Sequence, residues 1–460
     1  MSNLAEEMAE FAVGLRFEDL PAPVVHEVKR RVIDSLGCAL GAWSAGPAVI
    51  ARNVAARYRT TGPGATLLGT RTRVSPDWAA FANGCLVRYL DYNDTYLSKE
   101  PAHPSDNIPA ALAVAEAEEA DAREFVVASA LAYEIQCRLC DAASLRARGW
   151  DHVTYGVFSS ALAAARLMRL EVDRTRHAVG LAGVASAALR QSRVGELSHW
   201  KGCAFANAAR QGVFAALLAG AGMTGPAPIF EGDKGFEKLV SGPLDGFKLP
   251  TAAGGSSQEA FMILKTSMKW WPAEYHSQSA IEAALKVRTR LPDVGEIESV
   301  LVESHDAAVD IIGSEPEKWR PTRRETADHS LPYLVAVALA DGEVTAKQFE
   351  SARLADAKLL ALVQRVKVAR HKELSARYPE AVGNIVTTRL NDGSAVSERV
   401  DHPRGHAKNP LTDAEVEAKF CALAQPLLGR ARAEAALRRL WKLPEAGHIA
   451  ELLPLIEVSP

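Results

Sequence analysis

The chain has 460 residues, 48% of them apolar and 24% charged, a composition typical of a globular protein with room for two or three domains. Its net charge of −3 excludes the broad basic surface that nucleic-acid binding needs, and no apolar run reaches the roughly 18 residues that a membrane span requires. The N-terminal stretch has no basic and apolar signal pattern, so we expect a cytoplasmic protein with neither nucleic acid nor membrane as a partner.

Up to about residue 265 the sequence predicts one helix after another. Apolar side chains recur at helical spacing in VVHEVKRRVIDSLGCALG, PDWAAFANGCLVRYLDY, REFVVASALAYEIQCRLCDAASL, FSSALAAARLMRL and RTRHAVGLAGVASAALRQ. The density of Ala and Gly favours helices that pack closely against one another. We find no repeat of fixed period and therefore expect no solenoid.

The pattern changes near residue 290. EIESVLVESHDAAVDII, RVKVAR and NIVTTRLNDGSAVSERVD predict strands, the last one a hairpin about residues 391–393, with helices in SLPYLVAVALADG and AKQFESARL. NPLTDAEVEAKFCALAQPLL returns to helix, with Thr412 and Glu415 as a capping box.

This order of elements predicts a mainly α fold. An α+β domain over residues 268–400 interrupts a larger helical domain, which is formed by residues 1–267 and 401–460. Active sites favour the cleft between such domains.

The six cysteines are scattered, which is typical of reduced thiols rather than of a disulfide frame. Cys137 and Cys140 form a C-x-x-C pair that would be redox-active or half of a metal site. The pair lies in a helical pattern, however, and no second pair stands at metal-binding spacing. We expect it to be structural, and expect neither a metal nor another cofactor.

His103 precedes a polar run that predicts the start of a helix. Residues 105–107 are N-cap residue types, and Pro109 fits the first helical turn. The positive end of a helix binds anions and disfavours an imidazolium, so His103 is a candidate neutral base for an acidic substrate. The alternative is that His103 only supports the turn.

Four polar clusters stand out against the apolar helices. They contain, in chain order, Asp91, Asp94, Thr95 and His103; Asp151, His152 and Thr154; Arg190, Arg193, His199 and Lys201; and Lys269, His276 and Tyr333. Each has a plainer interpretation as a helix cap, a solvated charged face or a core tyrosine. Together they supply cations and proton carriers, with no G-x-S-x-G, P-loop or G-x-G-x-x-G motif. This combination favours proton transfer on a polycarboxylate.

Several of these stretches resemble the MmgE/PrpD family. LDYNDTY, AHPSDNIPAALAVAE, GWDHVTYG, LSHWKGCAFANAARQGVFAALLAGAGMTGPAPIFEG, WWPAEYHSQSAIEAAL and RETADHSLPYLVAVAL occur in the family's order and cover nearly the whole chain. The sequences PAEYHSQSAIEAA and RETADHSLPY are most similar to those of MmgE-type 2-methylcitrate dehydratases. The resemblance implies a helical domain built from both chain ends, a smaller α+β lid and a homodimer.

The resemblance also implies a cleft and a reaction. The implied site residues are Asp91, Thr95, His103, His152, Lys201, Lys269, His276 and Tyr333. Asp151 is the alternative to His152 at its position. Family members often have LDFDDT where this chain has LDYNDT, so Asn93 replaces a carboxylate that a metal would use. Arg88 stands where a histidine is common in the family.

The implied reaction is a metal-free β-elimination of water from a tricarboxylate, 2-methylcitrate. His103 or Tyr333 is expected to be the base, and His152 the acid or a substrate ligand. Asp91 is expected to orient His103 or to bind the substrate hydroxyl, while Lys201 and Lys269 stabilise the developing charge. The rivals are decarboxylation of cis-aconitate, epimerisation of iminodisuccinate and a helical scaffold without activity.

Overall fold

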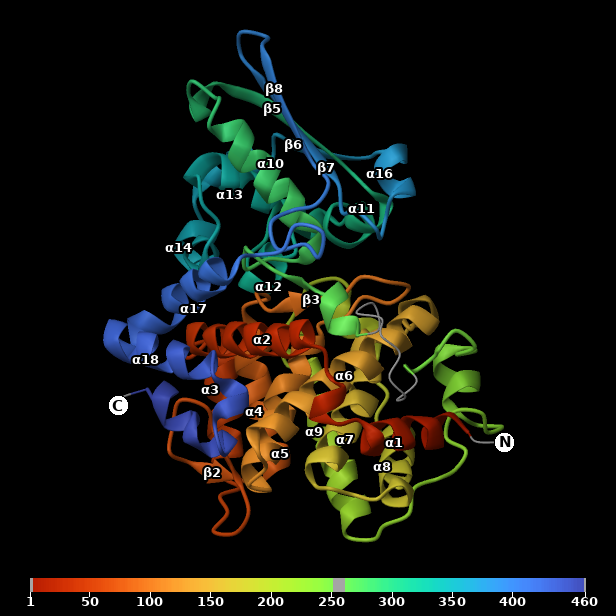
Figure 1. Cartoon of the computed structure of the whole chain (residues 1–460). Helices are drawn as coiled ribbons and strands as arrows, with labels where there is room; N and C mark the ends of the chain where they lie inside the picture. The colour runs from red at the N-terminus through yellow and green to blue at the C-terminus, as the bar shows by residue number, and fades with distance from the viewer. Residues whose placement is uncertain (1–2, 251–260, 459–460) are drawn as a thin grey trace.

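The computed structural model describes residues 3–250 and 261–458, and it is mainly α-helical with a small α+β region, as the sequence predicts. Buried apolar side chains form two separate clusters. One, the helical core, contains residues from Ala5 to Met268 together with residues from Leu411 to Ile456. The other, the α+β core, contains residues from Trp271 to Val400. Figure 1 shows the α+β core above the helical core.

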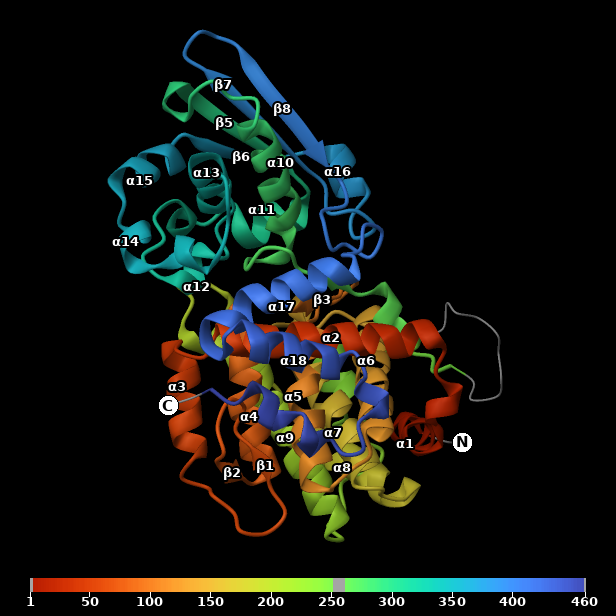
Figure 2. The ribbon, with the colours of Figure 1, turned by 60° about the vertical axis from the view of Figure 1, so that its left-hand side comes forward.

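The helical core is formed by helices from both parts of the chain. They are α1 (Leu4–Gly14), α2 (Ala22–Gly41), α3 (Gly46–Ala55), α4 (Pro76–Tyr89), α5 (Ile108–Ala117), α6 (Ala122–Ala142), α7 (Gly156–Leu167), α8 (Val172–Ala185), α9 (Ala204–Gly220), α17 (Asp413–Leu428) and α18 (Arg430–Leu440). The late helix α17 packs along the early helix α2, as Figure 2 shows. Two short antiparallel ladders, β1 (Ala65–Thr66) with β2 (Arg73–Val74) and β3 (Asp94–Thr95) with β4 (Ser267–Met268), accompany them.

Small residues let these helices approach very closely. A Cβ atom on Gly212 of α9 would lie 2.7 Å from the carbonyl oxygen of Val157 and 2.8 Å from the amide nitrogen of Ala161, both in α7. On Gly84 of α4 it would lie 2.8 Å from the Cβ atom of Ala206 in α9. The Ala- and Gly-rich patterns of the sequence are therefore required by the packing of the backbones.

The α+β core contains a four-stranded sheet in the order β6-β5-β7-β8. Its strands are β5 (Ile297–Ser304), β6 (Val366–Arg370), β7 (Asn384–Leu390) and β8 (Ala395–Val400), and its helices are α10 (Gln278–Arg288), α11 (Asp306–Ile312), α12 (Arg324–Ala327), α13 (Leu331–Asp341), α14 (Ser351–Leu354), α15 (Ala357–Val363) and α16 (Lys372–Ala376). Strands β5 and β6 are parallel, and the other pairings are antiparallel. Helices α10 and α13 contact each other and the sheet.

Local sequence signals located several of these features. The predicted hairpin is β7 and β8 joined through residues 391–393, and the capping box is present, since Glu415 accepts hydrogen bonds from the amide and hydroxyl of Thr412. The prediction of one strand over residues 296–312 is wrong in its second half. There the His305 side chain accepts a hydrogen bond from the amide of Ala308 and starts α11.

The predicted helix over residues 346–354 is also interrupted. It consists of a 3-10 turn, Ala346–Phe349, and the short helix α14, separated by Glu350 in an extended conformation. The C-x-x-C pair lies within α6, where Cys137 and Cys140 are free and fully buried. Burial raises the pKa of both thiols well above the usual value, which fits the structural role expected for them.

No single helix in residues 3–250 and 261–458 has both the length and the apolar composition that crossing a membrane requires. Helices α2 and α3 meet that test only as a pair, with a bend of 98° between them.

Replacing Gly212 by Ala will destabilise the helical core, because the added methyl group meets backbone atoms of α7 that cannot move aside. We expect a loss of about 1–3 kcal/mol and a lower melting temperature. Gly14→Ala is the matched control, since a Cβ atom there meets nothing within 4 Å. Equal melting temperatures for the two variants would contradict the close approach of α7 and α9.

Candidate active site

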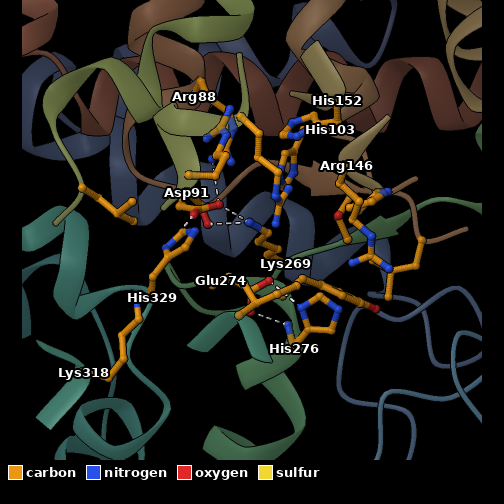
Figure 3. A pocket seen from close by; sticks show the side chains of 18 residues that line it. Arg88, Asp91, His103, Arg146, His152, Lys269, Glu274, His276, Lys318 and His329 are labelled. Atoms are coloured by element: carbon orange, nitrogen blue, oxygen red, sulfur yellow. Dashed lines mark hydrogen bonds and ion pairs between the residues drawn. The ribbon is translucent and has the colours of Figure 1, made fainter. Parts of the chain in front are cut away.

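One pocket lies between the two cores and is lined by side chains of both. Figure 3 shows Arg88, His103 and His152 on one side of it, with Glu274, His276 and Lys318 on the other. The cationic lining residues are Arg88, Arg146, Arg190, Arg193, Lys269 and Lys318, against the carboxylates of Asp91 and Glu274. This excess of positive charge suits a ligand with several negative groups.

Asp91 is buried at the centre of the charged groups, in the turn that follows α4. Its backbone has φ +52°, a left-handed conformation that is uncommon for a residue other than glycine. Its carboxylate pairs with Arg88 at 2.7 Å and with the ammonium of Lys269, which also donates to the Asp91 carbonyl at 3.0 Å. Burial favours a raised pKa for this carboxyl, but the charges of Arg88, Lys269 and Lys201 outweigh it and hold the pKa well below its usual value.

Lys201 stands on the far side of Asp91. Its ammonium lies 3.3 Å from Oδ2 of Asp91, 2.7 Å from Oδ1 of Asp328 and 3.0 Å from Nδ1 of His329. These are the ligand atoms that converge within 4.8 Å of one another as a possible metal site among the described residues. The ammonium of Lys201 thus supplies a positive charge to this group.

The short ladder of β3 and β4 sets the position of Lys269. Asp94 pairs with Met268 and Thr95 with Ser267, so Lys269 follows directly and reaches Asp91. Thr95 lines the pocket and donates its hydroxyl hydrogen to the carbonyl of Ala102.

His103 is held by the main chain of Asp94. Its Nδ1 lies 2.7 Å from the Asp94 carbonyl oxygen, which can only accept, so Nδ1 carries the proton and Nε2 of the neutral ring is a base. Burial lowers the pKa of the ring well below its usual value, and the charges of Arg88 and Lys269 lower it further.

The expected cause of this neutrality was a helix start, and the structure corrects it. Residues 105–107 form a 3-10 turn before α5 in which no side chain caps the turn locally. Instead the carboxylate of Asp94 accepts the amide hydrogen of Ser105 at 2.9 Å, and Tyr133 also donates to it. The anion at this helix start is therefore the protein's own, and burial together with the charges of Arg88 and Lys269 keeps His103 neutral.

His152 faces His103 with 5.8 Å between the ring centroids. Its Nδ1 lies 2.9 Å from the carboxylate of Asp151, and its buried Nε2 has no hydrogen-bond partner among the described residues. Asp151 does not line the pocket, and it pairs at 2.9 Å with Arg193, which does. Of the two alternatives at this position, His152 lines the pocket and Asp151 orients it.

Glu274 and His276 form a second carboxylate–histidine pair, contributed by the α+β core. Nδ1 of His276 lies 2.6 Å from Glu274, and Nε2 lies 3.3 Å from the hydroxyl of Tyr378. Burial opposes ionisation of Glu274, but the charge of His276 outweighs it and lowers the pKa of the carboxyl to about 2.

The structure brings most of the predicted site residues together. Those that line the pocket are Asp91, Thr95, His103, His152, Lys269 and His276. Lys201 does not line the pocket, but its ammonium contacts the carboxylate of Asp91. Of the two roles expected for Asp91, the carbonyl of Asp94 takes that of holding His103, while binding of the substrate hydroxyl stays a prediction.

Tyr333 lies apart from the pocket. It is fully buried in α13, where its hydroxyl donates to the carbonyl of Gln348 at 2.5 Å and its ring packs near Phe349. Burial raises the pKa of the hydroxyl, which makes it a weaker acid. A catalytic base at Tyr333 is not compatible with this position, and the plainer interpretation as a core tyrosine is correct.

Sequence reasoning missed several lining residues. Arg146, Glu274, Lys318 and His329 were given no role, and Arg88 was noted only for its identity. The signals for Glu274 and His329 were present, since each lies within two residues of a polar residue in WWPAEYHSQS or RETADHSLPY. Lys318 also begins the polar stretch KWRPTRRETADHSLPY, and Arg146 lies two residues before Arg148.

Two family models match the chain. The MmgE/PrpD N-terminal domain matches residues 6–246, and the MmgE/PrpD C-terminal domain matches residues 271–443. The 2-methylcitrate dehydratase of Salmonella typhimurium is 32% identical over 75% of this chain and 74% of its own length. The 2-methylcitrate dehydratase of Cupriavidus necator is 30% identical over 82% and 81%.

A relative with another name also matches. The cis-aconitate decarboxylase-like protein oryM of Aspergillus oryzae is 27% identical over 99% of this chain and 97% of its own length.

Tyr333→Phe will leave turnover and KM unchanged, because the hydroxyl lies outside the pocket. The lost hydrogen bond will lower stability by about 1 kcal/mol, which thermal unfolding will detect as a lower melting temperature. A large fall in kcat with an unchanged melting temperature would instead return Tyr333 to the reacting groups.

Proposed function

The chain belongs to the MmgE/PrpD family, and from this premise we propose that it is a hydro-lyase that removes water from 2-methylcitrate to give 2-methylaconitate. The two relatives named 2-methylcitrate dehydratase support this substrate. As part of the same proposal, and as the resemblance implies, the enzyme is a cytoplasmic homodimer whose α+β domain acts as a lid on the helical domain.

One observation carries the proposal: a neutral imidazole, His103, faces a pocket lined by six arginine and lysine side chains. A tricarboxylate carries the complementary charge. Its acidic proton is on a carbon next to a carboxylate, and a neutral imidazole is a base of suitable strength for removing it near neutral pH.

In the proposed reaction Nε2 of His103 takes this proton, and the electron pair of the C–H bond becomes the new carbon–carbon double bond. The hydroxyl group on the neighbouring carbon leaves with a proton as water. His152 supplies that proton from Nε2 when its ring is protonated beside the Asp151 carboxylate, or else binds the hydroxyl. The negative charge that develops on the carboxylate is stabilised by Lys269 and Arg88, which are already fixed by Asp91.

The proposal includes no metal ion. Its support is the ammonium of Lys201, which lies among Asp91, Asp328 and His329, the group best arranged for a metal among the described residues. Lys201 thereby supplies positive charge behind Asp91 without a cofactor.

Decarboxylation of cis-aconitate is the second candidate, because a relative carries that name over nearly the full length of both chains. It would use the same cationic pocket, with loss of carbon dioxide and protonation of carbon in place of loss of hydroxide. Epimerisation of an amino-dicarboxylate shares the proton transfer but has no relative among those described.

We expect the purified protein to convert 2-methylcitrate into a conjugated alkene, followed by ultraviolet absorbance, at the same rate with and without a chelator. Loss of activity in the chelator, restored by a divalent cation, would contradict the metal-free part of the proposal. No signal from 2-methylcitrate, with carbon dioxide released from cis-aconitate, would favour the second candidate.

His103→Gln will lower kcat/KM by about 100-fold or more, since it removes the base while keeping a polar side chain of similar size. Because the pKa of His103 is lowered, the ring loses its basic form only below its usual value of 6.5. The acid limb of kcat/KM for the wild-type enzyme will therefore lie below pH 6.5. Normal turnover of a folded His103→Gln protein would exclude this role.

A further inference from the structure

Lys419 is a buried cation that the proposed reaction does not use. It lies on α17 and is 4% exposed, outside the set of residues that line the pocket. Its ammonium lies 2.6 Å from the carboxylate of Asp34 on α2, and it donates to the carbonyl of Tyr92 at 2.7 Å and to that of Lys269 at 2.8 Å. The contact with Asp34 is thus an ion pair, while the two carbonyl groups accept hydrogen bonds from the ammonium.

The two carbonyl groups belong to the segments that carry the central ion pair of the pocket. Tyr92 directly follows Asp91, and the other carbonyl is that of Lys269 itself. The ammonium also lies 3.8 Å from the centroid of the Tyr92 ring, and the hydroxyl of Tyr92 donates to the carbonyl of Trp270. One side chain therefore fixes both partners of the Asp91–Lys269 pair through their main chains.

The backbone at Asp91 makes this support necessary. A left-handed conformation at a residue other than glycine costs free energy and persists only where the surroundings impose it. The bond from Lys419 to the next carbonyl group is such a constraint, and it acts from a helix more than 300 residues further along the chain.

We propose that Lys419 is a positioning residue, which sets the distance and direction of Lys269 toward Asp91. Helix α17, which follows the α+β core in the chain, thus completes the active site without touching the substrate. The inference rests on the proposed function only for its activity assay, because the geometry is independent of the substrate.

The competing interpretation is that Lys419 only neutralises Asp34. The pKa of the Asp34 carboxyl is raised by burial, against the opposing charge of Lys419. Lys419→Met alone would leave this carboxylate unpaired and endanger folding. The test therefore uses Asp34→Asn as the background, because asparagine removes the charge while the ammonium keeps both carbonyl groups.

We expect Asp34→Asn to retain activity, and Asp34→Asn with Lys419→Met to fold but to lose about 100-fold in kcat/KM, the effect of a displaced catalytic group. The acid limb of its pH profile will move to higher pH. The reason is that the charge of Lys269, together with burial and Arg88, lowers the pKa of His103, so displacing Lys269 raises the pKa of this base. Asp34→Asn with Lys419→Arg will recover part of the activity, since arginine restores the donors.

Two results would overturn the inference. One is a double variant with Lys419→Met whose kcat/KM and pH profile equal those of Asp34→Asn. If the wild-type enzyme does not act on 2-methylcitrate, the proposed substrate fails, and crystal structures of the same two proteins decide instead. The other overturning result is a crystal structure of the variant with Lys419→Met in which Lys269 still contacts Asp91. A displaced Lys269 in that structure supports the inference.

Discussion

The burial of the Asp91 carboxylate among three cations is the interaction on which the rest of the site depends. A buried carboxylate is costly unless it is paired, and Arg88, Lys201 and Lys269 supply the pairing from α4, the turn before α9 and the end of β4. Burial keeps His103 neutral together with the charges of two of these cations, Arg88 and Lys269, which also line the pocket. One buried carboxylate therefore holds together the cations that give the pocket its positive charge.

Local chemistry made much of the fold predictable. Helical periodicity located the long helices, Thr412 with Glu415 marked the start of α17, and residues 391–393 marked the hairpin. Side-chain partners distant in sequence were not predictable in this way. Asp94 caps the turn after His103 from outside that turn, and Lys201 finds Asp328 more than 100 residues away. Family motifs named the right segments, but Tyr333 shows that a motif does not say which way each side chain faces.

The two cores divide the work of the pocket. The helical core supplies His103, His152 and Asp91, while the α+β core supplies Glu274 and His276. The connection between them, from Met268 to Trp271, contains Lys269 itself. A change in the relative position of the cores would therefore act on Lys269, which contacts the carboxylate of Asp91.

The packing of α17 along α2 also bears on the order in which the molecule is made. The ribosome releases α2 early and α17 only after the whole α+β core, yet the two helices form one hydrophobic core. Until α17 emerges, the part of α2 that α17 covers is exposed, and the carbonyl groups near Asp91 lack their ammonium. A nascent chain thus cannot acquire a finished pocket before α17 has been synthesised.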